Sequence, residues 1–143
     1  MRRLAVKGAR MLMASAAATL AAACAQGPGG GGPSIAGLWA VAEIDGAAVP
    51  PDVPVTVNFA VDGRVSGTSG CNQYGGEYVY RKGVLTIGQT FTTEMACIDD
   101  YRMELESKFH NRFSGDLSVS ASPDGALLLG AKEAGLVLRK AAS

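Results

Sequence analysis

Short runs of alternating apolar and polar residues, each closed by a turn dipeptide, constrain this chain most. Val55, Val57, Phe59 and Val61 are apolar at every second position, and Asp62-Gly63 follows directly. Such alternation places one face of a strand in a core and the other in solvent, and Asp-Gly is a strong hairpin signal. The same kind of turn signal occurs at Asp45-Gly46, Lys82-Gly83, Pro123-Asp124-Gly125 and Ala134-Gly135. The chain from Ser34 onward is therefore expected to be mostly β.

Seven or eight short strands are predicted, and one segment has a helical period instead. The strands are expected at residues 35–44, 55–61, 64–68, 75–81, 84–87, 117–120, 126–130 and 136–138. The apolar residues of the helical segment are Ile98, Tyr101, Leu105, Phe109 and Phe113, which predict a helix over about residues 98–113. We expect an α+β fold, in which a small curved antiparallel sheet or partial barrel is covered at one face or end by this helix.

The N-terminus is typical of a secretory signal. Four basic residues lie within the first ten positions, and the 13 residues from Met11 to Ala23 carry no charge. A bilayer core of about 30 Å needs roughly 20 helical residues, so this stretch is too short to span it. A buried N-terminal helix is the alternative, but no polar positions recur at a helical period. Residues 1–23 are therefore predicted to be a signal peptide.

The end of this segment predicts how it is processed. Residues Leu20 to Cys24 resemble a bacterial lipobox, in which small residues precede a Cys that is lipidated and becomes the mature N-terminus. Ala21 stands where Leu is usual, so only a relaxed lipobox fits. The alternative is ordinary cleavage after Ala23 or Ala25, which would give a secreted or soluble periplasmic protein.

Residues 24–33 are expected to be a lipidated Cys followed by a flexible Gly/Pro-rich tether, with the folded domain at 34–143. Removing residues 1–23 leaves nine basic against 13 acidic residues, which argues against nucleic acid as a partner. Membrane attachment would then depend on the acyl chains at Cys24. Ala25 after the Cys is compatible with sorting to the periplasmic face of the outer membrane.

The three cysteines fit the same interpretation. A lipidated Cys24 leaves Cys71 and Cys97 as a pair, and an oxidising envelope favours a disulfide between them. No spacing indicates a redox motif or a zinc site, so no cofactor and no metal are expected.

One stretch resembles a known family. Residues Ser66 to Tyr78, with Gly70-Cys71-Asn72 at their centre, are similar to the signature of the META domain, the HslJ-like group of bacterial envelope proteins. The segment from Thr92 to Cys97 and Trp39 near the start agree in order, and the resemblance covers about residues 34–140. It implies a small curved antiparallel sheet with a helix, in proteins linked to novobiocin resistance, heat stress and virulence. No catalytic residue or ligand is carried over.

The motif residues have two interpretations. Gly67, Gly70, Gly75 and Gly76 permit positive φ or close backbone approach, and Asn72 can bond to local backbone, which favours a structural corner locked by the disulfide. Alternatively, the loop contacts a partner at the sheet edge. Its candidate contact residues are then Gly70, Asn72, Gln73 and Tyr74.

Catalysis has weaker support. Cys71 or Cys97 as a nucleophile would need a base, and His110, the single His, is expected near the helix C-terminus, either solvated or facing the helix dipole. Asp99-Asp100 are expected to cap the helix. Glu104 and Glu106 do not share a helix face and are expected on its solvated side. No catalytic residue is predicted.

Three functional hypotheses follow. The favoured one is a non-catalytic, monomeric envelope lipoprotein, anchored to the membrane through Cys24, that binds or supports an unknown envelope protein. The second is a carrier of a lipid or small apolar ligand, which requires a cavity lined by residues such as Phe59, Leu85 and Phe109. The third is a Cys-dependent enzyme.

Overall fold

The computed structural model describes residues 31–142. Two of the predicted turn dipeptides reverse the chain with the expected backbone geometry. Asp45 and Gly46 have φ angles of 54° and 78°, and Lys82 and Gly83 have 51° and 76°. Two consecutive positive φ angles are what a two-residue type I′ hairpin turn needs. The elements are β1 (Gly37–Ile44), β2 (Ala47–Ala48), β3 (Thr56–Phe59), β4 (Arg64–Thr68), β5 (Gln73–Arg81), β6 (Val84–Thr92), α1 (Asp100–Arg112), β7 (Gly115–Ala121), β8 (Leu127–Ala131) and β9 (Ala134–Lys140).

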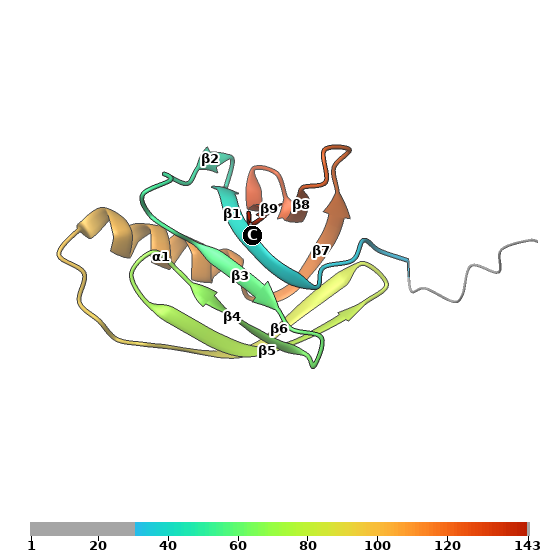
Figure 1. The fold of residues 1–143 in the computed structure, drawn as a ribbon, viewed down its shortest axis with the longest axis horizontal. Coiled ribbons are helices and arrows are strands. Elements are labelled where there is room, and N and C mark those ends of the chain that lie inside the picture. The colour runs from blue at the N-terminus through green and yellow to red at the C-terminus, as the bar shows by residue number, and fades with distance from the viewer. Residues whose placement is uncertain (1–30, 143) are drawn as a thin grey trace, which may run out of the picture.

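Eight of these strands close into an antiparallel barrel, and β2 is a short additional strand beside β1 (Figure 1). Closure comes from the pairing of β1 with β9, where Val41 lies opposite Leu138 and Ile44 opposite Leu136. The Lys140 ammonium lies 4.1 Å from the centre of the Trp39 ring, which adds a cation–π contact to this seam. The expected α+β fold, a partial barrel with one helix, is confirmed.

The barrel interior is filled by the alternating apolar residues. Val57 and Phe59 of β3 are buried, while Asn58 between them is exposed. From α1, Leu105 and Phe109 are buried, and Phe109 stacks on Phe113 with ring centroids 5.1 Å apart. The helix lies next to β1 and β9.

The entry of the chain and the N-terminus of α1 lie at opposite ends of the molecule (Figure 1). Figure 1 shows residues 31–36 entering at one end, while the loop before α1 and the first turn of α1 lie at the opposite end. The predicted signal peptide 1–23, the lipidation site Cys24 and all but the last residues of the tether 24–33 lie outside the described residues. Within residues 31–142, no helix is long and apolar enough to cross a membrane.

Several element boundaries differ from expectation, and the short strand β2 was not predicted. The helix begins at Asp100 because Asp99 caps it, its carboxylate accepting from the Tyr101 N–H at 3.0 Å. Strand β6 continues to Thr92, where β5 keeps pairing with it. Ala134-Gly135 is not a turn but part of β9, since Ala131 pairs with Ala134 across Lys132-Glu133. The sequence pattern did not predict the extensions of β6 and β9 because these depend on pairing with a neighbouring strand.

Candidate functional site

The Gly70–Tyr74 motif forms a corner between β4 and β5, and a disulfide ties it to the loop before α1. Cys71 and Cys97 are bonded, with their Cα atoms 6.0 Å apart. Gly70 has a φ of 102°, a conformation that a side chain disfavours. Its carbonyl accepts a hydrogen bond from Arg102 of α1 at 3.3 Å. The corner is thus joined covalently to the loop before α1 and by a hydrogen bond to α1 itself.

Asn72 is the centre of the corner, and its polar groups are fully used inside the protein. Its side-chain oxygen accepts from the Met95 N–H at 2.7 Å and from the Thr93 hydroxyl at 2.9 Å. Its side-chain amide donates to Glu106 at 3.1 Å, and its main-chain N–H donates to the same carboxylate at 2.9 Å. Since Asn72 is 8% exposed, no group remains to bind a ligand.

Glu106 corrects a prediction. We expected it on the solvated face of the helix, beside Glu104. Glu104 does lie there, in an ion pair with Lys108 at 2.7 Å. Glu106, two positions on, projects instead toward the corner and accepts from Asn72. The i,i+2 spacing that argued against a shared site is what sends the two carboxylates to different surroundings.

The other motif residues divide between the core and the surface. Tyr74 is 3% exposed, its hydroxyl donates to the Thr56 carbonyl at 2.8 Å, and burial raises the pKa of its phenol well above the ordinary value. Gln73 alone of the predicted contact residues has an exposed side chain. The residues named as a contact loop therefore form mainly a structural corner.

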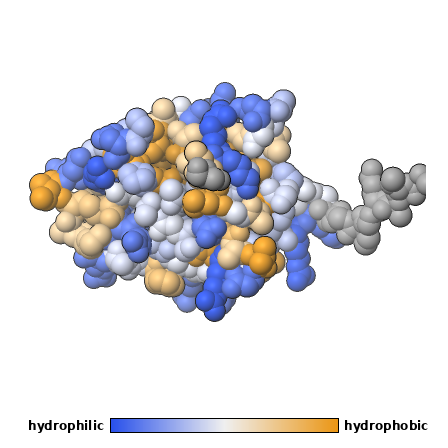
Figure 2. All heavy atoms as spheres, in the orientation of Figure 1, coloured by the Kyte–Doolittle hydropathy of each residue, from blue (hydrophilic) through white to orange (hydrophobic). Residues whose placement is uncertain are grey.

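Large apolar side chains are exposed beside this corner. Met95 is 60%, Ile98 105% and Met103 52% exposed, and we call these three residues the apolar tip. Helical periodicity placed Ile98 in the core stripe, which is wrong because the helix begins only after it. Figure 2 shows hydrophobic side chains at this end of the molecule, away from the end where residues 31–36 enter.

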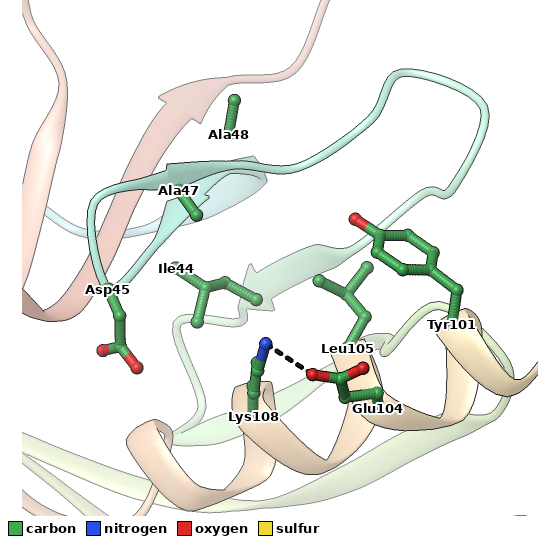
Figure 3. Close-up of a pocket in the computed structure, with 8 residues that line it drawn as sticks. All are labelled: Ile44, Asp45, Ala47, Ala48, Tyr101, Glu104, Leu105 and Lys108. Atoms are coloured by element: carbon green, nitrogen blue, oxygen red, sulfur yellow. Dashed lines mark ion pairs between the residues drawn. The ribbon is translucent and has the colours of Figure 1, made fainter.

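A groove of about 360 Å³ lies between the β1–β2 hairpin and α1 (Figure 3). Its floor is apolar, with Ile44 and Leu105, and its rim carries Tyr101 and the Glu104–Lys108 ion pair. Asp45, also at the rim, is paired with Arg112 at 2.7 Å. Because these rim charges are paired, the groove offers no free charge to fix an ionic ligand.

The interior does not offer the cavity that a carrier of an apolar ligand requires. Phe59 is 1% exposed, Leu85 and Phe109 are 0% exposed, and all three belong to one packed core. None of them lines any of the five surface hollows described within residues 31–142.

Comparison with known proteins agrees with the signature at the corner. The family model of the META domain matches residues 34–143. The chain belongs to the META domain family. No curated protein matches the sequence. An NMR structure with 22% identity resembles this META domain with a TM-score of 0.59, over 72% of this chain and 87% of its own. Another, from Burkholderia xenovorans, has 25% identity and a TM-score of 0.54, over 71% and 78%. At 22% identity, the first of these two structures shows a similarity of fold alone.

Candidate chemistry elsewhere in this META domain is limited. Both sulfurs of Cys71 and Cys97 are in the disulfide. Over residues 31–142, no three His, Cys, Asp or Glu side chains are placed to hold a metal ion.

His110 lies in the last turn of α1, as expected, but it is not fully solvated. Its ring is half-buried edge-on against Tyr74, 5.5 Å between centroids, and its Nε2 is buried with no hydrogen-bond partner in the described part of the chain. Burial lowers the pKa of His110, opposed by the charge of Glu106. Only the tertiary contact with Tyr74 produces this burial, so the sequence held no signal for it.

Proposed function

We propose that this META domain protein is a non-catalytic, lipid-anchored protein of the bacterial envelope that holds another envelope protein at its apolar tip. The observation that carries the proposal is the position of the tip. Met95 and Ile98 belong to the loop before α1 and Met103 to the first turns of α1, and Figure 1 shows these segments at the end opposite the entry of residues 31–36. A tether from a lipidated Cys24 would attach at that entry, so the tip would point away from the anchoring membrane.

The charges around the tip indicate the kind of partner. Glu94, Asp99 and Asp100 lie in or beside the loop that carries it. Carboxylates repel an anionic lipid surface, whereas they attract Lys and Arg. An apolar protein surface bordered by basic residues therefore fits the tip better than a bilayer does. Exposed apolar side chains with a polar rim are typical of protein interaction sites.

The anchor is tested by intact-mass spectrometry of the protein purified from its native membrane, with and without reduction and alkylation. The expected mass is that of a chain that begins at an acylated Cys24 and resists alkylation until it is reduced. An unacylated chain, or one cleaved elsewhere, would remove the basis for anchoring.

The tip is tested by a photo-crosslinking residue at position 98, compared with the same residue at position 61. Val61 is 94% exposed and lies beside residues 34–36, at the entry end, so it is a matched exposed apolar control. We expect one saturable adduct at position 98, lost in Met95→Asp, and none at position 61. Equal adducts at both positions would show nonspecific contact and overturn the assignment of the tip.

A further inference from the structure

The second half of β6 is an open sheet edge. β7 pairs with β6 only from Val84 to Ile87, while β5 continues alongside it as far as Thr92. Residues 88–92 thus have a neighbouring strand on one side alone, and all five are exposed. Among the eight barrel strands described within residues 31–142, this stretch leaves main-chain groups available to another chain.

The hydrogen-bond register shows which groups are available. The Thr93 N–H donates to the Gln73 carbonyl of β5 at 2.9 Å. Because main-chain groups alternate in direction along a strand, Phe91 also faces β5, and Thr90 and Thr92 face away from it. Within residues 31–142, no hydrogen-bond partner meets the outward N–H and C=O groups of these two threonines.

This edge has one of the features by which proteins block such pairing, a register shift against β5 near residues 88–89, but it lacks charge and proline. From Val84 to Thr93 there is no charged residue and no proline. The Phe91 ring is 72% exposed on the outer face of the strand, beside a hollow of about 710 Å³ that Gln89 and Glu77 also line. A strand added here would place its own side chains next to that ring.

We propose that the β6 edge at residues 88–92 binds an extended segment of another polypeptide by strand addition, with Thr90 and Thr92 supplying the main-chain hydrogen bonds. The chemistry of the edge specifies the occupant, since unpaired main-chain groups at strand spacing are matched by another main chain. Glu94, two residues beyond Thr92, has no ion-pair partner among the described residues. It favours a segment flanked by Lys or Arg.

A second copy of this chain fits the edge less well. If two edges paired antiparallel about Thr90, Glu94 of one copy would have to lie opposite Thr86 of the other, where β7 already pairs. Asp116 of β7 accepts from the Thr86 hydroxyl at 2.7 Å, so a carboxylate would also meet Glu94 there. Pairing Thr90 with Thr92 instead would bring Glu94 to Gly88, which lies beside Glu77.

The test uses the full processed chain in detergent and a labelled peptide, Lys-Thr-Val-Thr-Val-Thr-Lys, with binding followed by fluorescence anisotropy. Thr90→Pro removes one outward N–H without touching the bonds to β5, and Thr90→Ala keeps that N–H while removing the side chain. We expect saturable binding, weakened about tenfold or more by Thr90→Pro and unchanged by Thr90→Ala. A peptide N-methylated at three consecutive central residues should not bind.

Absence of saturable binding at millimolar peptide, equal binding by the two variants, or binding of the N-methylated peptide would each overturn the proposal. If Thr90→Pro unfolds at the same melting temperature as the wild type, its loss of peptide binding is not due to misfolding. Reversible dimers seen by sedimentation and abolished by Thr90→Pro would assign the edge to a second copy and also overturn it. The inference adds a second contact surface to the proposed function, and its failure would leave the anchor and tip experiments unaffected.

Discussion

Glu106 of α1 accepts hydrogen bonds from both the main-chain N–H and the side-chain amide of Asn72, at 2.9 and 3.1 Å. The two residues are separated by 34 positions in the sequence. Next to Asn72, the disulfide from Cys71 to Cys97 links the same corner to the loop before α1, with a sequence separation of 26. The helix is therefore held on the barrel at its first turns by a polar and a covalent link, and by Phe109 and Phe113 further along.

Removing the Glu106 carboxylate should destabilise the domain. Glu106→Ala leaves two donors of Asn72 without an acceptor in a partly buried site, so the free energy of unfolding should fall by about 2–3 kcal/mol. Glu106→Gln keeps one acceptor and should cost less. Urea denaturation measures both. Glu104→Ala, which removes an exposed ion-pair partner from the same helix, is the control and should change stability little. Equal losses in Glu104→Ala and Glu106→Ala would contradict the role assigned to Asn72.

Breaking the disulfide should have a larger effect. The bond closes a loop with a sequence separation of 26, for which the chain-entropy account gives roughly 3.5 kcal/mol. Cys71→Ala with Cys97→Ala should lower the urea midpoint accordingly. Reductant should destabilise the wild-type protein and leave the double variant unchanged. A reductant-insensitive wild-type midpoint would show that the bond adds nothing to stability.

Two motif glycines should tolerate alanine very differently. A Cβ at Gly67 would overlap the main-chain oxygen of Thr56, which cannot move without distorting β3, so Gly67→Ala should cost about 3 kcal/mol. A Cβ at Gly75 would meet the Phe91 ring, with Cζ 2.6 Å away. That ring is exposed and can turn aside, so Gly75→Ala should cost about 1 kcal/mol or less. Differential scanning calorimetry of both variants checks the order, and the reverse order would be incompatible with this packing.

Stability should depend on pH through His110. Burial lowers its pKa in the folded protein, so the unfolded chain binds the proton more readily. The stabilisation is therefore complete above the unfolded pKa of about 6.5 and is lost as the pH falls below it. His110→Phe should flatten the change in melting temperature between pH 7.5 and pH 5. Parallel pH profiles for the wild type and His110→Phe would mean that other groups, Glu106 among them, account for the loss.

Several features of the fold followed from neighbours in the sequence. Asp45-Gly46 and Lys82-Gly83 predicted their turns because positive φ angles suit those residues locally. Asp99 was correctly predicted to cap the helix by the same local logic, through the free N–H groups of a first turn. The periodic stripe placed Leu105, Phe109 and Phe113 in the core correctly. It also included Ile98 and Tyr101, which are exposed, since periodicity does not show where the helix begins or how its first turn packs.

The candidate contact surfaces could not be predicted from neighbouring residues in the same way. The motif around Asn72 was identified, but its internal bonding to Glu106 and Met95 was not, because both partners come from distant segments. The open β6 edge was missed altogether: the alternation ends near Ile87, and residues 88–92 form a strand only because β5 continues beside them.

The sequence by itself determined the turns, the strand faces, the cap of the helix and the family, since each depends on a few consecutive residues or on a local motif. The tertiary structure decided which strands meet, through the pairing of β1 with β9. It also decided which carboxylate faces the corner, which apolar side chains stay exposed at the tip, and where a strand lacks a neighbour. These are properties of contacts between residues far apart in the chain, and they arise only once the barrel has closed.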